Sequence, residues 1–325
     1  MINIENLVKK YGNVSALDGL SLQVRPGVVY GFLGPNGAGK TTTMRILSGL
    51  AWADGGKATI LGREVGGMQG DVRALIGVLP EEPAFYAWMS PKEYLRDFIA
   101  PMYGLEAPTA ARRADQLLSV VGLTEVANRR IGGFSKGMRQ RLGLAQALVH
   151  SPKVLLLDEP VSALDPAGRK DILDLIDGLR GKTTILLSTH ILADVERVCD
   201  VIGIINKGRL VIQAKRAALL EKYAQPLFEI EVEEGLSAWL ERIKNLPIVT
   251  GASIDNLSAR VLVKDVRAGE RSLLASLAES GLFVRRFEMV HPSLEDVFLQ
   301  LTEKDGGLST QDQNNNDQYD NSVSD

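Results

Sequence analysis

The chain has 325 residues, of which 45% are hydrophobic and 24% are charged, so it has ordinary globular composition and enough apolar residues for a sizeable core. Thirty-seven basic and 40 acidic residues give a formal net charge of −3, which disfavours nucleic-acid binding because that function needs a basic surface. A single cysteine and three histidines exclude a disulfide framework and a Cys/His zinc cage. No apolar run reaches the roughly 18–20 residues of a membrane span, and no secretory signal is recognised, so we expect a cytoplasmic protein.

Residues 1–222 are expected to form an α/β domain around a largely parallel sheet. Strands are predicted at the β-branched or leucine-rich segments 28–33, 154–157, 184–188 and 201–205, with helical stretches between them. Continuous apolar strands that alternate with helices are typical of a parallel sheet that is covered on both faces.

Residues 223–304 are expected to form a second, smaller α+β domain. Strands are predicted at 228–232, 248–254, 259–263 and 283–289, and helices at 236–244 and 268–280. This βαββαβ order indicates a ferredoxin-like fold. A last helix is predicted to begin at Ser293, whose side chain can cap it. Residues 305–325 contain five Asp and no Lys or Arg, and their polar composition predicts a disordered acidic tail.

The segment 34–42, Gly-Pro-Asn-Gly-Ala-Gly-Lys-Thr-Thr, carries the clearest chemical signal. It follows the predicted strand 28–33 and precedes the helical run 44–50, which is the context of a G-x-x-x-x-G-K-[ST] phosphate-binding loop, or P-loop. Its glycines allow backbone N–H groups to surround phosphate oxygens at a helix N-terminus. Lys40 is expected to reach the β- and γ-phosphates, and the Thr41 hydroxyl to ligate magnesium. The predicted nucleotide site therefore includes Gly34, Pro35, Asn36, Gly37, Ala38, Gly39, Lys40, Thr41 and Thr42.

Two acidic residues, Asp158 and Glu159, follow the predicted strand 154–157. Because a strand interior cannot hold ionised carboxylates cheaply, both are expected at its carboxyl edge, where ligands bind in such sheets. Asp158 is predicted to join the magnesium shell, and Glu159 to polarise the attacking water. His190 follows the strand 184–188 at the same edge and is predicted to contact the γ-phosphate.

Residues 134–141, Phe-Ser-Lys-Gly-Met-Arg-Gln-Arg, resemble the signature sequence of ATP-binding-cassette (ABC) ATPases, which is usually Leu-Ser-Gly-Gly-Gln. Leu79-Pro80-Glu81-Glu82 resembles the family's glutamine loop, Ser162-Ala163-Leu164-Asp165 the loop after its Walker B strand, and Ser188-Thr189-His190 its switch-histidine segment. The guanine-reading Asn-Lys-x-Asp is missing, since Asn206-Lys207 is followed by Gly208-Arg209. The resemblance implies a P-loop NTPase with a RecA-like core and a helical subdomain at about 86–142, which binds ATP and Mg²⁺ and hydrolyses ATP.

The resemblance implies further site residues beyond the P-loop. Tyr11 is expected to stack on adenine. Ser135 and Gly137 are expected to bind the phosphates held by a second copy of the chain, in a head-to-tail dimer. The implied metal ligands are Thr41, Glu81 and Asp158, and the implied catalytic residues are Glu159 and His190.

Some positions depart from the family pattern. Phe134 replaces Leu, and Lys136 and Met138 replace the usual signature residues. Glu81 stands where glutamine is usual; a carboxylate still ligates magnesium but adds a charge. We expect intact catalysis in spite of these changes.

Residues 85–103 hold six of the 18 aromatic residues. In the family this region docks the membrane subunit, and a dense aromatic patch fits an interface. Packing within the helical subdomain explains the aromatic residues equally well, so both interpretations stay open at this stage.

The order of the two domains resembles the ATPase subunits of exporter-like ABC systems, in which the membrane-spanning partner is a separate chain. Residues 291–298, His-Pro-Ser-Leu-Glu-Asp-Val-Phe, carry the C-terminal part of this resemblance. It implies ATP-driven export of an unknown substrate, at the cytoplasmic face of the membrane, through an integral membrane subunit and without nucleic acid. The alternatives are a soluble ABC ATPase that acts on ribosomes or DNA, and an importer ATPase. The single cassette, the absence of heptads and the lack of basic excess disfavour the first alternative.

Overall fold

The computed structural model describes residues 1–66, 72–162, 164–222, 226–233, 235–255, 258–290 and Leu294. The chain divides into two compact units, residues 1–217 and 218–325. None of the helices in the described part of the chain is long and apolar enough to cross a membrane.

A mostly parallel sheet forms the centre of the first unit. Its strand order is β10-β9-β3-β8-β7-β6, formed by Arg209–Lys215, Val201–Asn206, Val29–Leu33, Thr184–Thr189, Val154–Asp158 and Ile76–Leu79. Neighbouring strands pair in parallel, except that β10 runs antiparallel to β9. β3, β7 and β8 are buried along their whole length, as expected of apolar strands covered on both faces. The parallel sheet predicted from the four apolar segments is therefore confirmed.

A second, antiparallel sheet was not foreseen from the sequence. Its order is β2-β1-β4-β5, formed by Val14–Val24, Ile2–Tyr11, Gly55–Ile60 and Arg63–Glu64. Leu7 and Leu17 of this sheet share one core with Phe32 of the parallel sheet. The pairing of β1 with β2 shifts register at three places along β1. Such bulges interrupt the alternation of apolar and polar residues by which a half-buried strand is recognised.

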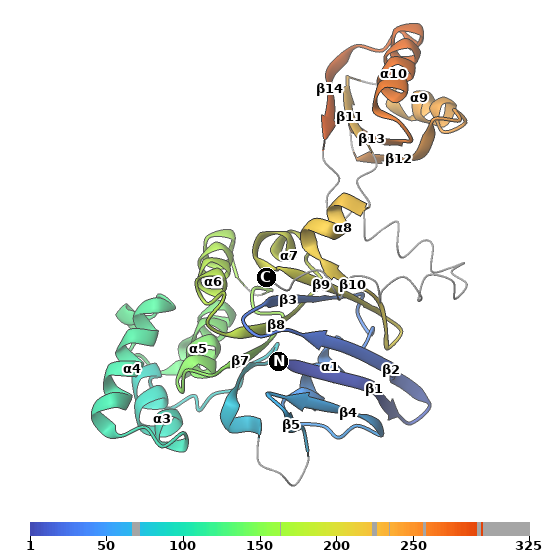
Figure 1. Cartoon of the computed structure of the whole chain (residues 1–325). Helices are drawn as coiled ribbons and strands as arrows, with labels where there is room; N and C mark the ends of the chain where they lie inside the picture. The colour runs from blue at the N-terminus through green and yellow to red at the C-terminus, as the bar shows by residue number, and fades with distance from the viewer. Residues whose placement is uncertain are drawn as a thin grey trace, which may run out of the picture. The chain divides into compact units, whose positions relative to one another are not determined.

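Helices surround these sheets. The P-loop leads into α1, Lys40–Leu47, and the stretch between β6 and β7 forms a helical region. That region contains α2 (Pro91–Glu93), the π-helix η2 (Tyr94–Ile99), α3 (Ala100–Met102), α4 (Ala107–Val120), η3 (Thr124–Val126), η4 (Ile131–Gly133) and α5 (Lys136–Leu148). Outside that region lie η1 (Val72–Leu75), α6 (Pro166–Gly178), α7 (Leu192–Val198) and α8 (Arg216–Lys222). In Figure 1, α3, α4 and α5, in teal to green, gather at one end of the unit, and the blue strands β1, β2 and β4 lie at the other.

The aromatic residues of 85–103 fall into two sets. Tyr94 is buried, and its ring lies 5.2 Å from that of Phe85 and 5.8 Å from that of Phe98, measured between ring centroids. Tyr86 and Trp88 are instead 47% and 65% exposed. Core packing therefore accounts for the first set, and the second set leaves aromatic rings on the surface of the helical region.

The second unit is a small α+β domain with the sheet order β12-β13-β11-β14. These strands are Val249–Asp255, Ser258–Val263, Leu227–Val232 and Val284–Val290, and neighbours pair antiparallel. Helices α9 (Leu236–Ile243) and α10 (Val266–Ser280) pack on the sheet around the fully buried Trp239. This is the predicted ferredoxin-like arrangement (Figure 1). The predicted helix from Ser293, apart from the buried Leu294, and the predicted tail at 305–325 lie outside the described residues.

Candidate functional site

The P-loop connects β3 to α1 in a backbone conformation that requires glycine. Gly37 and Gly39 have φ of 79° and 111°, values that residues with a Cβ adopt only at a cost. A Cβ added at Gly34 would lie 2.3 Å from the carbonyl oxygen of Ile205, and one at Gly39 would lie 2.6 Å from that of Ala16. The loop can therefore lie against the neighbouring backbone only because these positions carry no side chain.

Lys40, the first residue of α1, folds back over the loop. Its Nζ donates to the carbonyl oxygens of Gly34 at 2.6 Å and Pro35 at 3.1 Å, and the side chain is buried. Burial lowers the pKa of Lys40, and the carboxylates of Glu159 and Asp158 oppose that change. An ammonium held at the centre of a glycine loop is placed to pair with a phosphate group.

Asp158 ends β7 and is buried beside the P-loop. Burial raises the pKa of this carboxyl, and the hydroxyls of Ser188 and Thr41 and the charge of Lys40 oppose the rise. Within the described part of the chain, Asp158 Oδ1 has no hydrogen-bond partner. A free carboxylate oxygen near a threonine hydroxyl matches the oxygen ligands that magnesium prefers.

Magnesium at this place would need ligands from the nucleotide as well. The described residues contain no group of three or more His, Cys, Asp or Glu side chains that could hold a metal ion. Magnesium is commonly held by one or two carboxylates together with substrate phosphates. Asp158 and Thr41 therefore fit the protein's share of such a site.

Glu159 and His190 are joined by a hydrogen bond across the carboxyl edge of the sheet. His190 Nδ1 lies 2.8 Å from Glu159 Oε1, and Thr189 Oγ1 donates to Glu159 Oε2 at 3.4 Å. Glu159 has φ of 48°, and its backbone N–H donates to the carbonyl oxygen of Ser188 at 2.9 Å. Left-handed backbone at a residue other than glycine stores strain and is concentrated at functional sites.

Two further side chains hold the backbone of Glu159, and the sequence analysis did not assign them to the site. Gln140 Nε2 donates to the carbonyl oxygen of Glu159 at 3.3 Å, and Ser162 Oγ donates to the same oxygen at 3.1 Å. Gln140 is buried in α5 on the face that also carries Gly143 and Leu144. A glutamine at an apolar position of an amphipathic helix is the sequence signal that could have identified it.

A cavity of about 370 Å³ lies over the P-loop, which is within the usual size range of ligand pockets. It brings together nine of the predicted site residues: Asn36, Gly37, Gly39, Lys40, Thr41, Thr42, Glu81, Glu159 and His190. Val14, Ala16 and Ser162 complete the lining. Val14 and Ala16 belong to β2 of the sheet that was not foreseen, which explains why sequence reasoning missed them.

Seven predicted site residues do not line this cavity: Tyr11, Gly34, Pro35, Ala38, Ser135, Gly137 and Asp158. Gly34, Pro35 and Ala38 belong to the P-loop itself, and Asp158 lies close enough to Thr41 and Lys40 for both to affect its pKa. Tyr11 ends β1 with its ring exposed, and Lys9 Nζ lies 5.4 Å from the ring centroid. Ser135 is the exposed N-cap of α5 and accepts a hydrogen bond from the N–H of Met138 at 3.2 Å. A single chain therefore leaves the signature segment outside the cavity that its P-loop forms.

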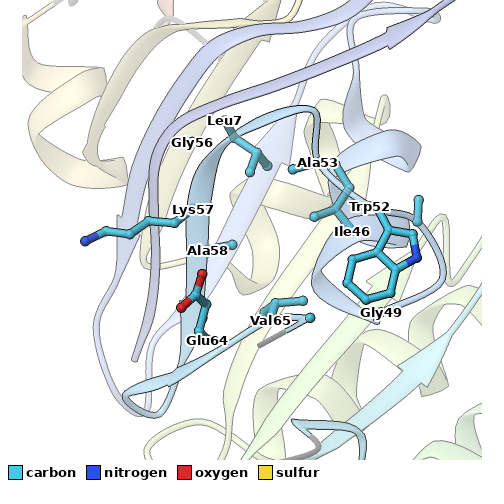
Figure 2. A pocket seen from close by; sticks show the side chains of 12 residues that line it. Leu7, Ile46, Gly49, Trp52, Ala53, Gly56, Lys57, Ala58, Glu64 and Val65 are labelled. Atoms are coloured by element: carbon cyan, nitrogen blue, oxygen red, sulfur yellow. The ribbon is translucent and has the colours of Figure 1, made fainter. Parts of the chain in front are cut away.

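A smaller cavity of about 200 Å³ lies between the antiparallel sheet and the end of α1 (Figure 2). Its lining includes the aliphatic side chains of Leu7, Ile46 and Val65. Figure 2 shows that Lys57 extends away from the cavity, and its Nζ pairs with Glu5 at 3.0 Å. This arrangement offers no cation to a phosphate among the described lining residues, in contrast to the cavity over the P-loop.

Comparison with known proteins agrees with this geometry. Residues 17–162 match the family described as ABC transporter, and residues 215–302 match the C-terminal domain described as ATP-binding protein DrrA1-3-like. An uncharacterized ABC transporter ATP-binding protein, YxlF of Bacillus subtilis (strain 168), is 43% identical, over 93% of this chain and 99% of its own length.

The chain belongs to the ABC transporter ATP-binding proteins. A second relative, the daunorubicin resistance ATP-binding protein DrrA3 of Streptomyces coeruleorubidus, is 34% identical over 94% of this chain and 96% of its own. The predicted family, P-loop fold and ATPase activity are thereby confirmed, as is the two-part layout of an ABC ATP-binding subunit.

Solved structures of ABC cassettes have the same fold as the first unit. The ATP-binding subunit of an ABC transporter superposes with a TM-score of 0.63 at 30% identity, over 69% of this chain and 93% of its own. A dimeric ATP-binding cassette in a post-hydrolysis state, bound to ADP and phosphate, superposes with a TM-score of 0.61 at 23% identity, over 66% of this chain and 98% of its own. The second likeness establishes the ABC fold alone.

Proposed function

We propose that this ABC ATPase hydrolyses ATP in the cavity over the P-loop and thereby powers export through a separate membrane subunit. The observation that carries the proposal is the meeting of Lys40, Glu159 and His190 around one cavity, with the Asp158 carboxylate close enough to Lys40 to affect its pKa. In this assignment Gly34, Asn36, Gly37, Ala38 and Gly39 surround the phosphates with backbone N–H groups. Pro35, which has no N–H, belongs to the same loop, and Thr42 borders the phosphates.

The proposed metal ligands are Thr41, Asp158 and Glu81. Magnesium, when bound, neutralises phosphate charge as it develops during hydrolysis. Thr41 lines the cavity and its hydroxyl lies beside the Asp158 carboxyl, and Glu81 lines the cavity two residues after β6. The carboxylate of Glu81 adds a negative charge, which acts to raise the pKa of Lys40 against the effect of burial.

Glu159 is the proposed general base, and His190 its partner. The Glu159 carboxylate borders the cavity and accepts from a group at each of its two oxygens, which restricts its orientation. In this orientation it can accept a proton from a water that attacks the γ-phosphorus. His190 borders the same cavity and is placed to keep the carboxylate and the γ-phosphate in register.

The active site is proposed to be completed by a second copy of the chain. Ser135 and Gly137 lie at the N-terminus of α5, where backbone N–H groups attract anions, yet they do not line their own chain's cavity. A head-to-tail dimer would bring this helix end of one copy to the γ-phosphate on Lys40 of the other. Tyr11, exposed at the end of β1, is proposed to stack on adenine.

The helical region is proposed to dock the integral membrane subunit at the cytoplasmic face of the membrane. Tyr86, Trp88, Met102 and Tyr103 are exposed there, and aromatic residues and methionine are enriched in protein interfaces. Such a partner would convert closing and reopening of the ATPase dimer into alternating access.

We further propose that the exported substrates are antibiotics or related drugs. The relatives with assigned roles include the daunorubicin resistance protein DrrA3, and the C-terminal match is to a DrrA-like domain. The proposed domains are the cassette at 1–222, including the helical subdomain at about 86–142, an accessory domain at 223–304, and a disordered acidic tail at 305–325. The accessory domain is assigned regulation or dimer support rather than chemistry.

Export by the complex of this chain with its membrane subunit tests the proposal. Inside-out vesicles that contain both proteins should take up daunorubicin or a related antibiotic when ATP and magnesium are added. Glu159→Gln should keep ATP binding but lower both hydrolysis and uptake by roughly 10²–10⁴, the usual contribution of a positioned base. Hydrolysis near the wild-type rate in this variant would refute the assignment of Glu159, and ATP-independent uptake would refute the transport function.

A further inference from the structure

An ion pair joins α6, which follows the segment of Glu159, to α7, which follows His190. Arg169 Nε lies 2.6 Å from Asp194 Oδ1. Arg169 belongs to the first turn of α6, and its N–H donates to the carbonyl oxygen of Asp165, the N-cap residue of that helix. Asp194 belongs to α7 and lies four residues after His190.

Asp194 is unusual for a helical aspartate because its carboxylate is buried. The side chain is 2% exposed, and within the described part of the chain its Oδ2 has no hydrogen-bond partner. Burial raises the pKa of Asp194, and the guanidinium of Arg169 opposes the rise. A buried ion pair is weak evidence for stability, since apolar residues often serve as well, but it can specify one geometry.

The ion pair fixes the position of the first turn of α7. This helix spans only Leu192–Val198, and its N-terminus has no side-chain cap. The side chain of His190 is 53% exposed, so packing alone does not fix its position. Through its buried ion pair with Arg169, Asp194 therefore connects the segment that carries His190 to the segment that runs from Glu159 to α6.

We propose that Arg169 and Asp194 form a positioning pair that holds His190 against Glu159 during ATP hydrolysis. The inference rests on the proposed roles of Glu159 and His190. Neither Arg169 nor Asp194 lines the cavity, so the pair acts through the two loops rather than on the nucleotide. Loss of the pair should slow the chemical step and leave ATP binding nearly unchanged.

The chain contains a matched control for this proposal. Arg197 Nη2 lies 2.6 Å from Asp174 Oδ1, and this second ion pair joins the same two helices, α7 and α6. Its side chains are 39% and 56% exposed, so water screens the charges. Exposed pairs of this kind contribute little to stability or geometry.

The test is steady-state ATPase activity of the purified full chain with magnesium, together with equilibrium binding of ATP. Asp194→Asn and Arg169→Gln should each lower kcat about tenfold and change the ATP dissociation constant by less than about twofold. The double variant should be no slower than the slower single variant, because either change breaks the same contact. Arg197→Gln and Asp174→Asn should leave kcat within about twofold of wild type.

A His190→Gln background separates positioning from a purely structural role. If the pair acts through His190, Asp194→Asn should cause no further loss of kcat once His190 is replaced. A further tenfold loss in that background, or multiplicative effects of Asp194→Asn and Arg169→Gln, would overturn the proposal. A loss of kcat from the Arg197 and Asp174 variants equal to that from the buried pair would overturn it as well.

Folding of the variants is checked by circular dichroism and thermal unfolding. If Asp194→Asn does not fold, Arg169→Gln decides the question, because the Arg169 side chain is 32% exposed and its replacement leaves no cavity in the core. Asp194→Glu keeps the pair and should retain kcat within about threefold. Glu159→Gln distinguishes failure of the proposed function from failure of the positioning pair. Full activity of Glu159→Gln would refute the proposed function. An inactive Glu159→Gln together with fully active Asp194 variants would refute the positioning pair alone.

Discussion

Replacing Asp158 by asparagine should stabilise the nucleotide-free protein while abolishing its response to Mg²⁺ and ATP. Asp158 is buried at the end of β7, and its Oδ1 has no hydrogen-bond partner among the described residues. Asparagine has nearly the same shape and keeps one oxygen for the neighbouring hydroxyls of Ser188 and Thr41. The substitution therefore removes a buried charge and creates almost no cavity.

The expected gain is small because two effects oppose each other. An unsatisfied buried polar group costs about 1–3 kcal/mol, more when it is charged. Asparagine relieves part of this cost but loses the attraction of the carboxylate to Lys40, which lies close enough to affect the Asp158 pKa. We expect a net gain of about 1 kcal/mol in the free energy of unfolding of the cassette, or about 2–4 °C in its Tm.

The difference between variant and wild type should depend on pH in a fixed direction. Burial raises the folded-state pKa of Asp158 above its unfolded value, so the contribution of this group to stability is present below about pH 4 and is lost as pH rises through the folded pKa. Asparagine does not titrate. The advantage of Asp158→Asn should therefore be absent in acid and should grow as pH rises toward neutrality.

The order of stability should reverse when Mg²⁺ and ATP are added. A ligand at 100 times its dissociation constant stabilises the folded state by about 2.7 kcal/mol, which exceeds the gain from asparagine. Wild type should receive this stabilisation, and Asp158→Asn should lose most of it with its metal ligand. Thermal unfolding at several pH values, with and without Mg²⁺ and ATP, measures all these terms. A less stable nucleotide-free variant, or equal stabilisation of both proteins by Mg²⁺ and ATP, would refute the reasoning.

Three further predictions concern the P-loop, the dimer and the membrane subunit. Gly34→Ala should abolish ATP binding, measured by equilibrium dialysis, because its Cβ would meet the carbonyl oxygen of Ile205 at 2.3 Å; binding at wild-type affinity would contradict the close approach. Ser135→Arg and Lys40→Ala chains should each be nearly inactive, and mixing them should restore part of the ATPase activity, since one site of the heterodimer carries neither defect. Absence of any recovery, with heterodimer formation confirmed, would count against shared sites. Trp88→Ser should reduce co-purification of the membrane subunit at least tenfold while the isolated chain keeps its ATPase rate; undiminished co-purification would exclude this surface.

The chemistry of the site was visible in the sequence because its residues are close together along the chain. A P-loop needs glycines, a lysine and a threonine within nine positions, and the segment 34–42 contains them between a strand and a helix. Asp158 and Glu159 were assigned in the same way, from two carboxylates that follow a buried strand. The βαββαβ order of residues 227–290 likewise predicted the ferredoxin-like domain, since short strand patterns, clearest in β11 and β13, alternate with two helical segments.

Contacts between segments far apart in the chain were decided only by the tertiary structure. Val14 and Ala16 reach the cavity because β2 pairs with β1, whose register shifts hide the strand pattern from sequence reasoning. Gln140 reaches the carbonyl oxygen of Glu159, 19 residues further along the chain, because α5 lies beside the end of β7. Sequence periodicity reports which face of an element is buried, but not which group it meets there. The chemistry proposed for this ATPase was therefore encoded locally, whereas the support of its proposed catalytic residues depended on how distant segments pack.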